Sequence, residues 1–95
     1  MSKSLLIIAH APSPNTIALA AAAQAGAAHP DVGDVRSRLA SPFDITPDDL
    51  RGVDGLLLGT TENIGYMAGA TKDMFDRCYN DWLGKTEGLA VGIYI

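Results

Sequence analysis

Two short polar segments of this sequence follow apolar runs, and their residue types suit the binding of a small molecule. The first, residues 10–16, reads His-Ala-Pro-Ser-Pro-Asn-Thr and follows an apolar run at 5–9. The second, residues 60–69, follows another apolar run at 55–59. Open α/β sheets hold their ligands in loops at the carboxyl ends of the strands. Two such loops on one sheet therefore predict a single binding site.

The first loop carries groups that suit a phosphate. Ser13, Asn15 and Thr16 supply two hydroxyls and an amide, and the start of a helix adds free N–H groups with a partial positive charge. The loop has neither the lysine of a P-loop nor the spaced glycines of a dinucleotide-binding turn. Simple capping of a helix by Asn15 or Thr16 explains this loop equally well when it is considered alone.

The second loop carries groups that suit the edge of a flat heterocycle. Gly65 and Gly69 let the backbone approach a ligand closely, and Glu62 and Asn63 supply polar side chains. Tyr66 is able to cover an aromatic ring. A plain turn with a surface tyrosine is the alternative. The presence of both loops in one chain favours the ligand site.

Alternating strands and helices are expected to position these loops. Apolar runs predict strands at residues 4–9, 34–40, 53–59 and 88–95, the second of them at a sheet edge. Alanine-rich residues 17–28 predict a helix that Gly26 and Pro30 end and that His29 caps at its negative end. A short capped turn is expected to start at Pro47.

Residues 66–80 predict an amphipathic helix. Its buried stripe is expected to contain Met67, Ala70, Met74, Phe75 and Cys78. Lys72 is spaced to pair with Asp76 on the opposite face. The alternation of elements predicts a single α/β domain over residues 1–95, in three layers around an open parallel sheet.

Composition excludes several classes of function. The chain has 95 residues and a net charge of −4 without any lysine or arginine cluster, so binding to nucleic acid or to an anionic membrane is not expected. Its one cysteine, Cys78, excludes an internal disulfide and indicates a reducing compartment, which predicts a cytoplasmic location. His10 and His29 lack the spacing of a metal site, so no metal is expected.

The polar loops resemble those of a known family. Ser13-x-Asn15-Thr16 after the first strand, and residues 59–77 after the third, are similar to the flavodoxin-like superfamily, closest to its FMN-binding, NAD(P)H-dependent reductases. The resemblance implies sheet order 2-1-3-4, with the family's fifth strand and last helix lacking. It also implies FMN as the cofactor, with no general acid or base. The implied cofactor-binding residues are His10, Ser13, Asn15, Thr16, Thr60, Thr61, Glu62, Asn63, Ile64, Gly65 and Tyr66.

The same resemblance implies that electrons pass from NAD(P)H through FMN to a small acceptor such as a quinone or free flavin. Two alternatives stay open: a flavodoxin-type electron carrier without nicotinamide turnover, and a flavin-free fragment that acts as an interaction or structural module. A receiver-type signalling domain is disfavoured because His10 and Thr60-Thr61 stand where it needs acidic residues. The apolar segment 89–95 predicts an exposed sheet edge and self-association, or pairing with a partner segment.

Overall fold

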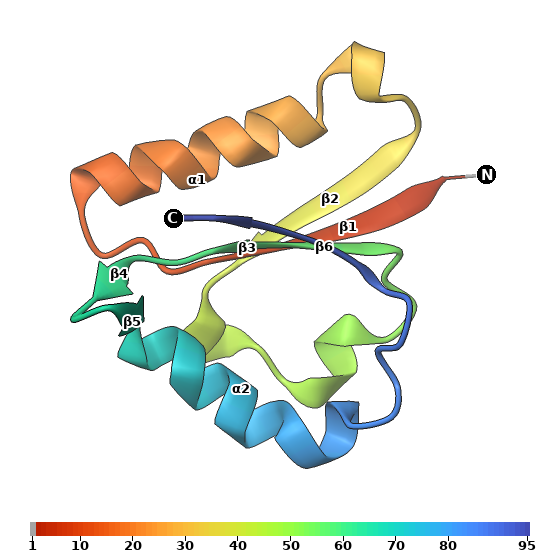
Figure 1. Ribbon diagram of the computed structural model, residues 1–95. Coiled ribbons are helices and arrows are strands. Elements are labelled where there is room, and N and C mark those ends of the chain that lie inside the picture. Colours follow the sequence, from red (N-terminus) through yellow and green to blue (C-terminus); the bar gives the residue numbers. More distant parts are fainter. Residues whose placement is uncertain (1) are drawn as a thin grey trace.

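The computed structural model describes residues 2–95 as a parallel sheet with helices on both faces (Figure 1). The strands are β1 (Lys3–Ala9), β2 (Val35–Ala40), β3 (Gly55–Gly59) and β6 (Ala90–Tyr94). They lie in the order β2-β1-β3-β6, and every adjacent pair is parallel. The predicted α/β class and the predicted strand order are therefore confirmed, with β6 as the fourth strand of the sheet.

Two helices lie on opposite faces of this sheet. Helix α1 (Pro14–Ala27) contacts β1 and β2, whereas α2 (Gly69–Trp82) covers the other face together with short 3₁₀ turns. These turns are η2 (Pro42–Asp44) and η3 (Pro47–Leu50), and a third turn, η1 (Pro30–Val32), follows α1. In the view of Figure 1, α1 lies above the sheet and α2 lies below it.

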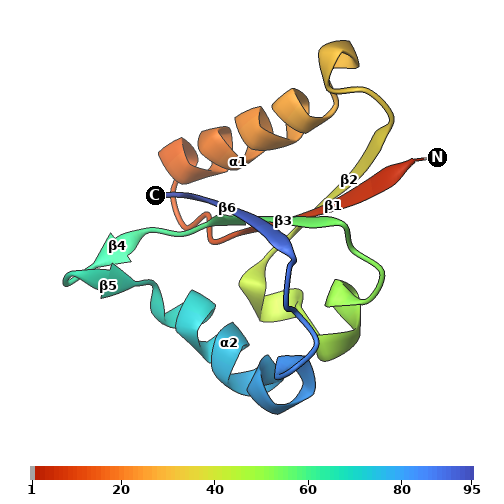
Figure 2. The same ribbon diagram turned by 45° about the vertical axis from the view of Figure 1, so that its right-hand side comes forward.

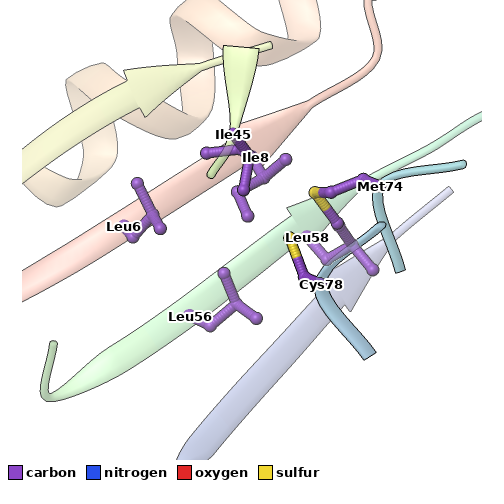
Figure 3. Close-up of a cluster of buried hydrophobic side chains, with 7 residues drawn as sticks. All are labelled: Leu6, Ile8, Ile45, Leu56, Leu58, Met74 and Cys78. Atoms are coloured by element: carbon purple, nitrogen blue, oxygen red, sulfur yellow. The ribbon is translucent and has the colours of Figure 1, made fainter. Parts of the chain in front are cut away.

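The main core lies between the sheet and α2. Side chains that alternate along the strands point to this face, because successive residues of a strand face opposite ways. Figure 3 shows the cluster, which consists of Leu6, Ile8, Ile45, Leu56, Leu58, Met74 and Cys78. Cys78 is fully buried, as predicted, and burial raises the pKa of its thiol. It therefore serves as a packed core side chain.

Helix α1 begins earlier than predicted. Its N-cap is Ser13, and Pro14 occupies the first helical position, where its fixed φ and missing N–H are tolerated. The prediction of an N-cap at Asn15 or Thr16 was therefore wrong by two or three residues. His29 does not cap this helix either, since its Nδ1 accepts a hydrogen bond from the Asp31 amide and begins η1.

Helix α2 begins later than predicted, at Gly69 rather than at residue 66. The preceding residues form a hairpin of β4 (Glu62–Asn63) and β5 (Tyr66–Met67). Met67 is therefore a strand residue and not part of the helical stripe. Met74 and Cys78 are buried as predicted, and the Lys72–Asp76 pair is present on the exposed face. Neither helix of residues 2–95 combines the length and apolar character that a membrane span requires.

Candidate functional site

The two polar loops leave the sheet side by side. β1 and β3 are adjacent, and their last residues, Ala9 and Gly59, face each other in register. The amide of His10 then donates to the carbonyl of Gly59 at 3.0 Å, so the first residues of the two loops are joined directly. Figure 2 shows the start of α1 and the β4–β5 hairpin at the same end of the sheet. The predicted convergence of the two loops is confirmed.

The phosphate-type loop is closed on itself by a capping box. The Thr16 amide donates to Ser13 Oγ at 3.3 Å, and the Ser13 amide donates to Thr16 Oγ1 at 2.9 Å. Thr16 Oγ1 also donates to the Ser13 carbonyl at 2.9 Å. These contacts fix the entry into α1 and use most of the polar groups of both residues. The hydroxyl oxygens of Ser13 and Thr16 also lie 2.9 Å apart, so the Ser13 hydroxyl donates to Thr16 Oγ1, whose own proton goes to the Ser13 carbonyl.

Asn15 is the predicted site residue best placed to meet an anion. It lies in the first turn of α1 with an exposed side chain, and its N–H has no carbonyl four residues earlier within the helix. The first turn of α1 contains no acidic residue, so the partial positive charge of the helix is not neutralised there. The loop therefore retains the Asn15 amide groups and the partial positive charge of the helix start.

The hairpin tip adopts a turn with two positive φ values. Ile64 has a φ of 55° and Gly65 a φ of 75°, the pattern of a type I′ turn between two antiparallel strands. Gly65 tolerates this conformation, whereas a β-branched residue such as Ile64 is strained by it. The Ile64 side chain is fully exposed and the Tyr66 ring is 56% exposed. The tip thus presents apolar surface to solvent at the edge of the site.

Glu62 does not face a ligand position. Its carboxylate accepts a hydrogen bond from the Gly65 amide and closes the hairpin turn. The expectation that Glu62 addresses a heterocycle directly is therefore not supported by the geometry, because its side chain already serves the turn. Asn63 and Gly65 remain exposed on the hairpin, and Thr61 is half-buried at its base.

Thr60 organises the base of the second loop. Its Oγ1 donates to the Thr61 carbonyl at 3.0 Å and accepts from the Ala68 amide at 3.2 Å. The fully buried hydroxyl of Thr71, on α2, also donates to it at 3.2 Å. Thr60 therefore ties the end of β3 to the start of α2. Its hydroxyl is occupied, so it positions the loop and is not a free ligand group.

The His10 ring packs against η2. It meets the Phe43 ring edge-on, with centroids 6.1 Å apart and an interplanar angle of 75°. His10 is half-buried, while Phe43 is 67% exposed. The His10 side chain thus borders the candidate site through an aromatic contact on the η2 side.

Tyr94 is a site-edge residue that the sequence reading missed. Its ring lies across Gly59, so close that a Cβ on that glycine would stand 2.2 Å from the ring carbon bearing the hydroxyl. The Thr60 amide donates to the Tyr94 carbonyl at 3.2 Å. Burial raises the pKa of the Tyr94 phenol. The available signal was the glycine at the end of β3, which leaves room for a large side chain from the adjacent strand.

Two clefts lie away from this site. One, of about 540 Å³, lies near the amino ends of β3 and β6, and its polar border includes Asp48, Arg51 and Lys85. The other is an apolar groove of about 380 Å³ between α2 and β6. None of the predicted cofactor-binding residues borders either cleft. Over residues 2–95, no three His, Cys, Asp or Glu side chains gather as a metal site.

Comparison with models of known protein families finds no match for this chain, and comparison with curated protein sequences finds none either. Function is therefore inferred from the residues and the geometry described above.

Proposed function

We propose that this chain is a flavodoxin-like, FMN-binding oxidoreductase of the cytoplasm, passing electrons from NAD(P)H to a small acceptor such as a quinone or flavin. One observation carries the proposal: the His10–Gly59 hydrogen bond joins an anion-suited helix start to a polar hairpin at the carboxyl edge of a parallel sheet. Ligands of open α/β sheets bind at this edge. The loop residues supply donors for a phosphate and for a heterocycle within one continuous surface.

The phosphate group of FMN would be held by the start of α1. The Asn15 backbone N–H and the Asn15 side-chain amide are the donors that the capping box leaves available, while Ser13 shapes the loop through its bonds to Thr16. Thr16 acts mainly by holding Ser13 in place, since its hydroxyl is bonded to both the amide and the carbonyl of that residue. The donor set fits a phosphate that is bound without a lysine or arginine.

The ring system of FMN would lie against the hairpin. Thr61, Asn63 and the Gly65 carbonyl are the exposed or half-exposed polar groups there, and Tyr66 supplies an aromatic face. Thr60, Glu62 and Ile64 shape the loop and its tip. The bound flavin supplies the hydride and electron chemistry, while the chain's own residues bind and orient it. No side chain is required as a general acid or base.

A titration with FMN and riboflavin tests the proposal. Flavin fluorescence is expected to be quenched by the chain, and FMN is expected to bind at least about tenfold more tightly than riboflavin, which lacks the phosphate. Absence of quenching by FMN at millimolar protein would contradict the proposal. It would favour the flavin-free interaction module instead.

Asn15→Asp sharpens this test without harming the fold. A carboxylate in the first turn of a helix is stabilising, yet it repels a phosphate at the same place. FMN binding should weaken at least about tenfold, whereas riboflavin binding should not change. Gln24→Glu, at the other end of α1 and exposed, adds the same charge and serves as the control. Equal effects of the two variants would argue against a phosphate site at Asn15.

The reductase is separated from a pure electron carrier by turnover. Loaded with FMN, the chain is expected to oxidise NADH or NADPH in the presence of a quinone, followed by the loss of absorbance of the reduced nicotinamide. Binding of FMN without such turnover would support the carrier.

A further inference from the structure

The β6 edge of the sheet carries unpaired backbone groups. Among residues 2–95, β3 is the one strand that pairs with β6, and β6 is the outermost strand on the side opposite β2 (Figures 1 and 2). The Tyr94 carbonyl accepts from Thr60 and so faces β3. Because the direction of N–H and C=O groups alternates along a strand, the backbone groups of Val91 and Ile93 face outward. Each presents one donor and one acceptor to a further strand.

The side chains beside this edge are apolar and uncovered. Val91 is 54% exposed and Ile93 63% exposed. Both line the apolar groove of about 380 Å³, whose far wall is formed by α2, with Tyr79, and by Leu83 just after it. Tyr79 and Leu83 are also more than half exposed. The edge and the groove form one continuous apolar surface.

We propose that this surface pairs with the same surface of a second copy of the chain, β6 against β6 and antiparallel. β6 spans Ala90–Tyr94 and is centred on Gly92. A two-fold axis at Gly92 therefore matches the whole strand with itself. It places the outward-facing Val91 opposite Ile93 of the second copy, where the pair exchanges two backbone hydrogen bonds. The two sheets then continue as one sheet of eight strands.

The register also satisfies the side chains. Gly92 meets the second Gly92 at a non-hydrogen-bonded position, where strands approach most closely, and no side chain obstructs that approach. Val91 and Ile93 of both copies fall on the α2 face, so the two apolar grooves join across the axis. A specific interface buries about 1,200 Å² or more of accessible surface in total. The dimer therefore has to bury the two grooves as well as the strand edges.

This surface is where charge opposes contact between identical copies least. The chain carries a net charge of −4, so two copies repel each other over most of their surfaces. Residues 88–95 contain no charged side chain. Like-charge repulsion is therefore least where the two β6 strands meet, and the isologous contact closes as a dimer.

The test measures association of the full chain without added flavin. Light scattering after size exclusion and sedimentation velocity, over about 1–300 μM, should show a concentration-dependent dimer, in the affinity range of a small interface. A monomer throughout this range overturns the proposal. The measurement does not involve FMN, so its outcome is independent of the proposed cofactor.

Charge-swapped variants test the register. V91K/I93K should be monomeric because lysine faces lysine, and V91E/I93E should be monomeric because glutamate faces glutamate. An equimolar mixture of the two should dimerise, since each lysine then faces a glutamate. The dissociation constant of each single species should rise at least about tenfold above that of the unmodified chain. Failure of the mixture to associate, with both species folded by circular dichroism, overturns the antiparallel register.

Two further sets of variants serve as a control and as a substitute for the double variants. A18K/A22K adds two lysines at exposed positions of α1 and should leave the dimer intact. If the double variants of β6 fail to fold, I93K mixed with V91E tests the register with one change per chain, because the introduced lysine then faces the introduced glutamate. This mixed pair should bind more tightly than either variant binds itself, where each charge faces an apolar side chain. Loss of the dimer in A18K/A22K would overturn the assignment to β6, because it would show that net charge alone controls association.

Discussion

The two edges of this sheet, β2 and β6, solve the problem of unpaired backbone groups in different ways. β2 carries Arg36 and Arg38 at exposed positions, and α1 contacts it on one face. β6 carries no charge, and all of its residues except Tyr94 are exposed. Charged side chains on an edge strand discourage pairing with other chains. The comparison indicates that the charged side chains of β2 protect that edge against association, whereas nothing on β6 prevents pairing with another chain.

The two edges also differ in how they are fastened to the rest of the molecule. Beyond β2, the η2 region is tied to α2 by Arg77, whose guanidinium donates to the carbonyls of Pro42 and Ile45 at 2.7 Å each. β6 is fastened by its pairing with β3 and by the Tyr94 ring across Gly59. The Arg77 hydrogen bonds, a polar clamp, therefore stabilise the side of the sheet that carries β2. The side that carries β6 depends on strand pairing and on one aromatic contact.

Removal of the polar clamp is expected to have the largest effect on stability. Arg77→Ala removes the guanidinium donor from the Ile45 carbonyl and leaves the Pro42 carbonyl with the long 3.5 Å bond from the Ile45 amide, and both residues are buried. The free energy of unfolding should fall by about 2–3 kcal/mol, measured by urea denaturation. Arg51→Ala is the control, because its pair with Asp48 is exposed and should contribute less than about 0.5 kcal/mol. Equal effects would contradict the role of the clamp.

Displacement of the Tyr94 ring is expected to have the next largest effect. Gly59→Ala places a Cβ where the ring lies, so the ring must swing into solvent. The loss of its buried area should lower the free energy of unfolding by about 1–2 kcal/mol. In a Tyr94→Ala background the same change should be neutral or slightly stabilising, since alanine is less flexible than glycine. A similar cost in both backgrounds would show that the ring is not the cause.

Removal of a charge from β2 should make this edge as prone to pairing as β6. Arg36→Thr removes an exposed positive charge from β2 and raises its β propensity. We expect species larger than a dimer, because a chain with two open edges extends as a filament or ladder. Sedimentation velocity on unmodified and variant chains measures this. Arg36→Lys keeps the charge and should behave as the unmodified chain does, so an equal shift in both variants would contradict the prediction.

The smallest expected effect concerns the carboxylate that pairs with Arg38 of β2. The Thr46 amide donates to Asp49 Oδ2 at 2.6 Å, and this bond, with a further contribution from Arg38, lowers the pKa of Asp49. A lowered folded-state pKa gives stability that is present above the unfolded-state pKa and is lost as the pH falls through the folded value. Asp49→Asn should cost about 0.5–1 kcal/mol at pH 7.

The cost of this change should shrink as the pH falls through the lowered folded-state pKa of Asp49, because the carboxyl of the unmodified chain then gains a proton and loses its charge. Urea denaturation at a series of pH values from 7 downward measures this decline. Asp48→Asn, a change at a neighbouring exposed position, is the control and should cost less than Asp49→Asn at pH 7. An unchanged cost across the acid range would contradict the assigned pKa shift.

Much of the fold was readable in the sequence because apolar runs and alanine propensity are local signals. The four sheet strands and both helices lie where those signals place them, within a few residues. The errors fall at the helix starts. The first helix was predicted to start at residue 17, beyond Pro14, although proline fits the first helical position. The second was predicted to start at residue 66 because residues 66–68 continue the amphipathic pattern, but residues 66–67 form a strand of a hairpin. Turn geometry at Ile64 and Gly65 decided that second case.

The candidate site was predictable in outline but not in the role of each residue. The family resemblance implied that the first and third strands are neighbours, so the meeting of the two loops was expected. Which polar groups remain available depends on contacts that residue types do not reveal. Glu62 closes its own turn, and Thr60 bonds to Ala68 and Thr71. Tyr94 enters the site edge from a strand that carried no polar motif.

The sequence by itself determined the class of fold, the order of its elements and the charge-free character of residues 88–95, because propensity, periodicity and composition are properties of short segments. The tertiary structure alone decided which polar groups of the two loops are already hydrogen-bonded and which strands form the edges of the sheet. Those outcomes depend on the pairing of β1 with β3 and of β3 with β6. Such contacts join residues that are distant in the chain, and no local pattern encodes their geometry.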